Sequence, residues 1–390
     1  MNKVKKLDVL VAGYLGIDLI PDFKKTQQNV PLQDLLKPGK LTEIDGLQLS
    51  LGGVVANTGI ALKKFNKLVY LNGLTGSDFM GKIIQEWLQR YQIDAGIKML
   101  PDASTAFGIV IAPPGVDRIF LESPGCNEVF SKSDIDFKVM QQSRIFHFGY
   151  PPLLKQFFAD NGSQLIKLFS EAQNLGVVTS LDLSLPDPQS ESSKCDWPAM
   201  MNNVLPFTDI FVPSIEELLN IMMPDEYESI VAAAGENDLI DFITMDLIKN
   251  LGSQIIDLGV KILLIKMAHR GAYLLTGDVS SVNEKGSLQL DTETWNHTEL
   301  HCEAYPVDPH RFKNASGAGD TAAAAFLAAL IDGESAGRSL QYACMAGRNN
   351  LYCNDIYQEL DTWETMTTEI NAGLDEPAMV SNLKSESFNL

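Results

Sequence analysis

Short apolar segments recur along the chain, and most of them end at a glycine or just before a polar residue. Their length and their content of Val, Ile and Leu are typical of buried β-strands. The predicted strands are residues 7–13, 68–74, 145–148, 177–181, 209–212, 260–266 and 272–276. Longer segments with helical spacing of apolar residues lie between them. The predicted helices are residues 52–65, 79–91, 163–175, a segment from 213 onward, 317–332, 336–353 and 361–371.

This alternation of strands with helices predicts an α/β fold, with a mostly parallel sheet that helices cover on both faces. Two segments near 41–51 and 107–122 predict short antiparallel strands, which we expect to form a separate flap over one edge of that sheet. Residues 222–258 are acidic and mostly helical in pattern, and residues 277–310 are polar and indicate a long excursion. The tail to residue 390 shows no clear element.

Several polar residues follow directly after predicted strands. Asp18, Asp182, Glu217 and Gly271 all lie just past the end of such a segment. The carboxyl ends of parallel strands share one edge of a sheet, where ligands of open α/β folds bind. We therefore expect these residues to lie near one another and near Asp320.

Residues 317–332 form the most apolar predicted helix, and Gly333 stands where that helix should end. A helix that is apolar on every side is expected to lie buried inside a large domain. Gly317 and Gly319 precede or begin its first turn, and they remove side chains that would block access to the unpaired N–H groups. Such a helix start typically binds an anion, most often a phosphate.

The first turn of this helix also carries Asp320, whose carboxylate repels phosphate. A loop that only binds phosphate should lack this residue. The residue fits if Asp320 accepts the proton of a hydroxyl while that hydroxyl attacks a phosphoryl group held by the loop. The alternative is an ordinary turn in which Asp320 is a favourable acid of the first helical turn.

A second pair of glycines, Gly52 and Gly53, opens the helix predicted to end near residue 65. Glycines at a helix start allow a ligand to approach the backbone closely. Asn57, in the first turns of the same helix, offers one donor and one acceptor group and so suits a sugar hydroxyl. The alternative is that Asn57 caps the helix or lies at the edge of the core.

Composition narrows the range of partners. The formal charge is −20, from 30 Lys and Arg against 50 Asp and Glu, which disfavours nucleic acid and anionic membranes. The chain has five scattered cysteines without a C-x-x-C pair, which is typical of reduced thiols. The sequence shows neither a signal-peptide pattern nor an apolar run long enough to span a membrane, so we expect a soluble cytoplasmic protein.

Other motif matches are weaker. The G-x-G-x-x-A pattern from Gly317 is typical of dinucleotide binding. That interpretation requires a strand directly before the pattern and a second strand after it that ends in an acidic residue, and both are missing. The segment from Gly76 lacks the Ser or Thr of a P-loop, and Ser335 in a G-x-S-x-G match has no later histidine. We interpret His297, together with His301, as part of an exposed polar segment rather than a metal site.

Taken together, several segments resemble the PfkB/ribokinase family of sugar and nucleoside kinases over about residues 7–371. The matching segments are Gly52–Asn57, Gly76–Gly81, Gly125–Asn127, Pro213–Glu217, Lys266–Gly271 and Asn314–Asp320. Their order and spacing make the resemblance specific. It implies one ribokinase-like domain over residues 1–390, a Rossmann-type α/β/α sandwich. It also implies a small β-sheet lid, built from segments at about 14–51 and 105–123.

The resemblance implies an ATP-dependent kinase for a sugar-like hydroxyl, with ATP, Mg²⁺ and a monovalent cation as candidate cofactors. Asp320 resembles the general base, and the amides of Gly317, Ala318 and Gly319 resemble the anion hole. The residues that resemble substrate contacts are Asp18, Gly52, Gly53 and Asn57. Those that resemble nucleotide contacts are Lys266, Gly271 and Ser316, and Glu217 resembles the acid that organises magnesium. A homodimer through the lid also fits this resemblance.

Three positions depart from the family pattern. Asn314 and Ala315 replace its usual Asp-Thr, Ser214 replaces the Asn of Asn-x-x-Glu, and Lys266 replaces a common Thr. These changes leave a second hypothesis open, a catalytically silent relative that binds sugar or nucleotide; a dehydrogenase is a third. The acceptor also stays open among ribose, fructose, a ketodeoxy sugar acid, a phosphorylated ketose and a nucleoside.

Overall fold

The computed structural model describes residues 5–113, 119–373 and 380–382. Its strands are β1 Leu7–Gly13, β2 Gly16–Asp22, β3 Gly46–Gly52, β4 Val69–Gly76, β5 Asp94–Leu100, β6 Ala106–Ile111, β7 Ile119–Ser123, β8 Ser143–Gly149, β9 Val178–Asp182, β10 Ile210–Phe211, β11 Ile262–Lys266, β12 Ala272–Thr276, β13 Glu299–Cys302 and β14 Val380–Asn382. Its α-helices are α1 Leu32–Leu35, α2 Val54–Lys64, α3 Phe79–Arg90, α4 Phe137–Met140, α5 Lys155–Asn174, α6 Trp197–Val204, α7 Ile215–Met222, α8 Pro224–Ala234, α9 Met245–Asp257, α10 Ser280–Glu284, α11 Thr292–Trp295, α12 Ala318–Asp332, α13 Ala336–Asn350, α14 Ile356–Glu359 and α15 Trp363–Ala372.

In the described part of the chain the larger sheet has ten strands, in the order β14-β13-β12-β11-β10-β9-β8-β1-β4-β5. Neighbouring strands from β5 to β11 pair in parallel. The strands β12, β13 and β14 extend the sheet in antiparallel fashion at one edge. The predicted mostly parallel sheet is therefore confirmed.

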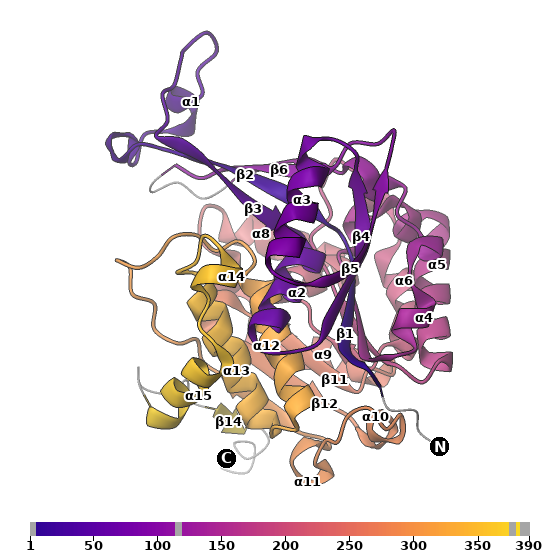
Figure 1. Cartoon of the computed structure of the whole chain (residues 1–390). Coiled ribbons are helices and arrows are strands. Elements are labelled where there is room, and N and C mark those ends of the chain that lie inside the picture. The colour runs from indigo at the N-terminus through magenta and orange to yellow at the C-terminus, as the bar shows by residue number, and fades with distance from the viewer. Residues whose placement is uncertain (1–4, 114–118, 374–379, 383–390) are drawn as a thin grey trace, which may run out of the picture.

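Helices cover both faces of this sheet, and each face has its own hydrophobic core. Val9 and Val11 of β1 face the core formed with α2, α12 and α13. Leu10 and Ala12 face the core formed with α5, α6, α7 and α9. In Figure 1, α2, α12 and α13 lie on one side of the sheet, and α5 and α6 lie on the other. Continuous apolar runs are what a strand buried on both faces requires.

The helix α12 lies at the centre of one of these layers. Residues 323–330 have no exposed surface, and the helix packs against α2 and α13. Its small alanine side chains allow these neighbours to approach closely. At its C-terminus Gly333 adopts a left-handed conformation with φ of 78°, as the sequence predicts for a glycine that ends a helix.

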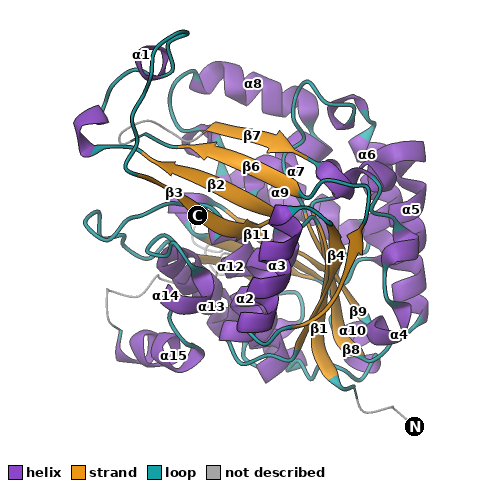
Figure 2. Ribbon diagram, turned by 45° about the horizontal axis from the view of Figure 1, so that its top comes forward, coloured by secondary structure: helices purple, strands orange, loops and turns teal. Residues whose placement is uncertain are grey.

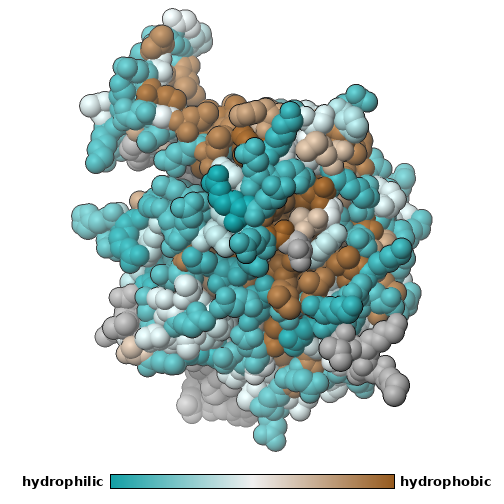
Figure 3. Space-filling view, in the orientation of Figure 1, coloured by the Kyte–Doolittle hydropathy of each residue, from teal (hydrophilic) through white to brown (hydrophobic). Residues whose placement is uncertain are grey.

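The smaller sheet has the strand order β3-β2-β6-β7. β2 begins at Gly16, directly after the carboxyl end of β1 at Gly13, so the smaller sheet starts at the edge where the parallel strands end (Figure 2). Leu47, Leu49 and Leu121 leave 56%, 38% and 52% of their surface exposed. Figure 3 shows apolar residues gathered over this sheet and the arm that extends from it.

Two sequence-based expectations need correction. Residues 277–310 are not a polar excursion, because β13 adds an antiparallel strand to the larger sheet and the buried Trp295 packs edge-on against Phe326 of α12. β13 alternates partly exposed and buried residues, and this pattern hides its role in a polar sequence. Part of the tail is also ordered, since β14 pairs with β13. In the described residues, none of the helices has the length and apolar content needed to cross a bilayer.

The close packing of α12 predicts that added volume on this helix destabilises the fold. Ala325→Leu should lower the free energy of unfolding by about 1–3 kcal/mol, because a leucine must displace neighbours in a filled core. Urea denaturation of the full chain measures the change. Ala372→Leu, at the exposed end of α15, is the matched control and should leave stability nearly unchanged. Equal effects of the two substitutions would contradict this packing.

Candidate active site

The candidate site lies at the edge of the larger sheet where its parallel strands end. Tyr150 follows β8, Asp182 is the last residue of β9, and Lys266 is the last residue of β11. The first turns of α2 and α12 point their amino ends at the same edge, bringing Asn57 and Asp320 to it. The convergence expected from the sequence is thus present in the structure for Asp182 and Asp320.

Asp320 is 3% exposed and is held by side chains of α2 and of the residue that follows β8. Its Oδ2 accepts hydrogen bonds from Asn57 Nδ2 at 2.9 Å and from the Tyr150 hydroxyl at 2.7 Å. Its Oδ1 has a longer contact of 3.5 Å with the Thr58 hydroxyl. Oδ2 is therefore well satisfied, while Oδ1 keeps capacity to accept a further hydrogen bond.

Opposing effects act on the protonation of Asp320. Burial raises the pKa of its carboxyl above the ordinary value, because a charge is costly away from water. The positive charge of Lys266 and the hydrogen bonds from Asn57, Tyr150 and Thr58 counteract this rise. The result is a carboxylate that binds a proton more readily than an exposed aspartate.

Gly317 and Gly319 differ in what their missing side chains leave open. Gly317 has φ of +73°, and a Cβ added there would lie 3.2 Å from the Asn57 carboxamide. A Cβ at Gly319 would meet only the Lys266 side chain, at ordinary distances from 3.5 Å. Gly317 is thus required by the backbone and by Asn57, whereas the protein itself has room for a side chain at 319.

The loop before α12 is tied to the end of α13. Asn350 donates from Nδ2 to the Ser316 carbonyl at 2.8 Å, and its Oδ1 accepts from the Thr321 hydroxyl at 2.8 Å. Asn314 donates from Nδ2 to the Cys353 carbonyl at 3.0 Å. These contacts fix the loop on both sides of Gly317, so the first turn of α12 is rigidly placed.

Lys266 lies behind this turn, in a buried cluster of charges. Its ammonium contacts both carboxylate oxygens of Asp182 at 2.9 Å, and the Asp182 side chain is fully buried. Burial raises the pKa of Asp182 and of Glu217, and the charge of Lys266 opposes the rise for both. Lys266 therefore keeps several carboxylates, including Asp320, together at one edge of the sheet.

Glu217, expected to organise magnesium, forms the capping box that begins α7. Its Oε2 accepts from the Ser214 N–H at 2.7 Å, and the Ser214 hydroxyl accepts from the Glu217 N–H at 3.2 Å. A capping box satisfies the unpaired donors of a helix start. Ser214, which departs from the family pattern, thus still positions Glu217 at the site.

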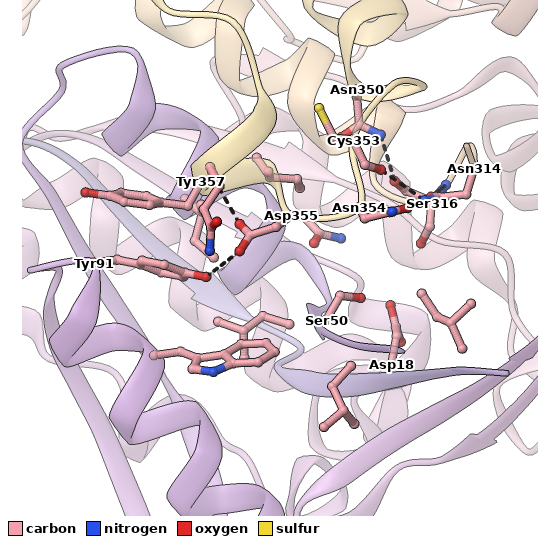
Figure 4. Close-up of a pocket in the computed structure, with 18 of the residues that line it drawn as sticks. Asp18, Ser50, Tyr91, Asn314, Ser316, Asn350, Cys353, Asn354, Asp355 and Tyr357 are labelled. Atoms are coloured by element: carbon pink, nitrogen blue, oxygen red, sulfur yellow. Dashed lines mark hydrogen bonds between the residues drawn. The ribbon is translucent and has the colours of Figure 1, made fainter. Parts of the chain in front are cut away.

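A cavity of about 230 Å³ lies beside these groups. Asp18, Asn57 and Ser316 line it, so Ser316, expected near the nucleotide, borders the same space as two expected substrate contacts. In Figure 4, Asp18 and Ser50 lie on one side of this space, with Ser316 across from them. Asn57 joins the cavity to Asp320, which does not itself line it.

The glycines near this cavity have structural reasons of their own. A Cβ at Gly52 would lie 2.7 Å from Asp18 Oδ1, and one at Gly53, where φ is +81°, would lie 2.5 Å from the Tyr14 carbonyl oxygen. Gly271, at φ of +82°, would place a Cβ 2.0 Å from the Cys302 carbonyl oxygen of β13. These positions allow protein segments to approach closely, and roles in ligand binding stay predictions.

The site contains residues that sequence reasoning missed. Tyr150 adopts φ of +65°, which is uncommon for a residue with a side chain and is often found at functional sites. No sequence motif marks it, because its partner Asp320 is 170 residues away. Thr58, next to Asn57, was also missed, as was Glu122, which accepts a hydrogen bond from the Tyr14 hydroxyl at 2.8 Å.

The weaker motif matches have structural explanations. Asp78, in the segment that resembles a P-loop, caps α3 through the Gly81 N–H and also accepts from Thr105. Ser335 caps α13. His147 is fully buried and hydrogen-bonds Ser180 at 2.9 Å, as expected of a core histidine. Among the described residues, groups of three or more potential metal-binding side chains are absent.

Comparisons with known proteins identify relatives of this chain. The chain is similar to the probable chloroplastic fructokinase-6 of Arabidopsis thaliana, at 23% identity over 67% of this chain, and spans about three fifths (61%) of that protein's length. It is also similar to a 5-dehydro-2-deoxygluconokinase of Clostridium beijerinckii, at 20% identity over 96% of both chains.

Solved structures show the same fold. The structure of Arabidopsis thaliana ribokinase with ribose and ATP matches with a TM-score of 0.67 at 19% identity, over 93% of this chain and 98% of that one. Ribokinase from Giardia lamblia matches with a TM-score of 0.67 at 17% identity, over 94% and 100%. Residues 7–352 match the family model described as pfkB family carbohydrate kinase. The chain belongs to the pfkB family of carbohydrate kinases.

Proposed function

We propose that this protein transfers the γ-phosphoryl group of ATP to a hydroxyl of a sugar-like small molecule, with Asp320 as the general base. The observation that carries this proposal is the buried Asp320 carboxylate in the first turn of α12, fixed by Asn57 and Tyr150. A carboxylate beside the free N–H groups of a helix start would repel an anion that only binds there. It suits a site where the carboxylate accepts a proton during phosphoryl transfer.

In the proposed reaction, the acceptor hydroxyl donates its proton to Oδ1 of Asp320, the oxygen with spare capacity. The hydroxyl oxygen forms a bond to the γ-phosphorus while the bond from that phosphorus to the bridging oxygen of ADP breaks. Asn57 and Tyr150 hold the carboxylate by its other oxygen. The chain's contribution is thus mostly positioning and charge stabilisation.

The anion hole in this proposal consists of N–H groups of the first turn of α12, over Gly317, Ala318 and Gly319. Such groups lack acceptors within the helix, and the helix dipole favours negative charge next to them. The space beside Gly319, where only Lys266 is near, leaves room for phosphoryl oxygens. Donors fixed before the reaction stabilise developing charge without having to reorganise.

The acceptor is proposed to bind in the cavity lined by Asp18 and Asn57. In the described residues Asp18 has no hydrogen-bond partner, so its carboxylate is free to accept hydrogen bonds from sugar hydroxyls. Asn57 holds Asp320 through its Nδ2 and also lines this cavity, where it is proposed to contact the same hydroxyls. Gly52 leaves room for the Asp18 side chain, and Gly53 allows the chain to turn into α2.

ATP and magnesium are the proposed co-substrate and ion. Lys266, Gly271 and Ser316 stay the predicted nucleotide contacts. The similar ribokinase of Arabidopsis thaliana was solved with ATP, and a putative ribokinase II of E. coli with ATP and Mg²⁺. Mg²⁺ bound with nucleotide phosphates needs only one or two protein carboxylates. Glu217, half-buried at the site, fits that requirement, and the ion would supply charge neutralisation of the phosphates. Dependence on a monovalent cation stays a prediction.

The smaller sheet is proposed to act as a lid on a single kinase domain, with lid segments at about 14–51 and 105–123. It begins at the edge of the larger sheet where the cavity lies, and Asp18 of β2 reaches that cavity. Exposed apolar side chains such as Leu47 support a homodimer that pairs through this lid. Residues 114–118 of the second lid segment lie outside the described residues.

The second candidate is a silent relative that binds sugar or nucleotide without turnover. The replacement of the family's Asn by Ser214 supports this silent protein less than the sequence alone indicates. The serine still positions Glu217 through the capping box. Release of ADP with a panel of sugars and nucleosides separates the two, since binding without ADP release supports the silent protein. Binding of NAD or NADP would instead favour a dehydrogenase.

Replacing the proposed base should remove turnover and keep binding. Asp320→Asn should lower kcat by about 10²–10⁴-fold, because an amide cannot accept the hydroxyl proton. Coupled ADP release measures kcat, and calorimetry measures ATP and acceptor binding. Asp246→Asn, an exposed residue of α9 with the same charge change, is the control. A kcat for Asp320→Asn close to that of the control would refute the role of Asp320.

The space at Gly319 offers a test of the anion hole. Gly319→Ala should leave the unfolding temperature nearly unchanged, because the added Cβ meets only a flexible lysine at ordinary distances. It should lower kcat by about tenfold or more if phosphoryl oxygens occupy that space. Thermal unfolding and ADP release are measured on the same preparation. A stable variant with full activity would remove the anion hole from the mechanism.

Tyr150 should influence the pH dependence of the reaction. Its hydrogen bond lowers the pKa of Asp320 against the effect of burial, so Tyr150→Phe should raise that pKa further. Because the base must be ionised, the acidic limb of the kcat profile should move to higher pH and activity should recover in alkaline buffer. Tyr227→Phe on α8 is the control. A uniform loss of kcat at every pH would indicate a purely structural role.

A further inference from the structure

A row of residues crosses the smaller sheet on the face that closes the cavity. The strand register pairs Ser50 of β3 with Asp18 of β2, Asp18 with Gly108 of β6, and Gly108 with Glu122 of β7. Residues paired directly across neighbouring strands lie on the same face of a sheet. Because Asp18 and Ser50 line the cavity, Glu122 lies on the cavity face as well.

The glycine in this row lets two carboxylates meet. A Cβ at Gly108 would lie 3.1 Å from Asp18 Oδ1 and 3.4 Å from Glu122 Oε1, so both side chains border the space that the glycine leaves. The Tyr14 hydroxyl donates to Glu122 Oε2 at 2.8 Å and fixes this side chain. In the described residues, Oε1 of Glu122 and the Asp18 carboxylate have no hydrogen-bond or ion-pair partner.

We propose that Glu122 is a specificity residue which, together with Asp18, restricts the acceptor to uncharged sugars and excludes sugar acids and sugar phosphates. The proposal rests on the proposed kinase function, because it concerns the acceptor of that reaction. Hydroxyl groups of a neutral sugar donate hydrogen bonds to free carboxylate oxygens. A carboxylate or phosphate on the acceptor would instead add negative charge beside them.

The electrostatics of this space support the exclusion of anions. Burial, followed by the negative charges of Glu122 and Asp320, raises the pKa of Asp18 to about 7. Partial loss of hydration also raises the pKa of Glu122. Negative charge is therefore already unfavourable in this space. An anionic acceptor would bring a further negative charge close to Asp18 and Glu122, and this repulsion lowers its binding affinity.

Among the described residues that line the cavity, one is basic, Arg90. It lies in the last turn of α3, is exposed, and precedes Tyr91, which Figure 4 shows on the side of the cavity away from Ser316. An acidic acceptor that used Arg90 would need its anionic group at that side. Arg90 thus provides the competing explanation, and its substitution belongs in the test.

The test compares acceptors that differ by one anionic group. D-fructose, 2-keto-D-gluconate and fructose 1-phosphate are matched in this way, and D-ribose adds a second neutral sugar. With the full chain and ATP, kcat/KM from ADP release should be on the order of a hundredfold higher for the better neutral sugar than for either anion. Tryptophan fluorescence, with Trp87 in the cavity wall, measures binding of the same compounds without turnover.

Substitution of Glu122 separates specificity from folding. Glu122→Gln keeps the size of the side chain and an acceptor for the Tyr14 hydroxyl, and it should raise the anion-to-neutral ratio of kcat/KM by about tenfold. Glu128→Gln, an exposed residue with the same charge change, should leave that ratio unchanged. A ratio that is the same for both variants overturns the proposal.

The other outcomes are equally decisive. Preference of the unmodified chain for an anionic acceptor, lost in Arg90→Gln, overturns the role of Glu122 but leaves the kinase function intact. Selective binding of neutral sugars without ADP release supports the specificity and contradicts the kinase function. Failure of every neutral sugar in the panel to bind, tested by fluorescence, contradicts both.

Discussion

The site depends on the burial of one carboxylate, Asp320, at the amino end of a helix that has no exposed side. Burying a charge is costly unless hydrogen bonds and opposite charges compensate. Asn57 from α2, Tyr150 after β8 and the charge of Lys266 provide that compensation from three different elements. The positions of α2 and α12 relative to the sheet are therefore coupled to the protonation state of Asp320.

Close approach of backbone segments is the second constraint, and glycine meets it. Gly317 leaves room for the carboxamide of Asn57, and Gly52 leaves room for the carboxylate of Asp18. A side chain at either position would displace the polar group that the site needs. Gly319 is different, because the protein leaves space there that its own atoms do not use. Gly317 and Gly319 belong to one motif, but the absence of a side chain thus has a different physical consequence at each position.

The sequence predicts features that depend on local patterns. The apolar runs of β1 and β8, and the buried helix α12 with its terminal Gly333, follow from periodicity and end signals. Tyr150 could not be predicted, because its role depends on a positive φ and a partner far along the chain. Glu122 depends on the register of four strands, which one sequence does not determine. The strand β13 was missed because a strand that is buried only at every second residue tolerates polar residues.

Lys266 stands where the family commonly has Thr. Its ion pair with Asp182 changes how this departure from the family pattern is interpreted. An ammonium has three donors, and its contacts with both carboxylate oxygens of Asp182 occupy up to two of them. Fewer donors are then left for a nucleotide phosphate. Because the same charge opposes the pKa rise of Asp320, Lys266 acts first on the charge balance of the site. The contribution to nucleotide binding proposed for Lys266 is then mainly through the electrostatic field at the first turn of α12, beside Gly319.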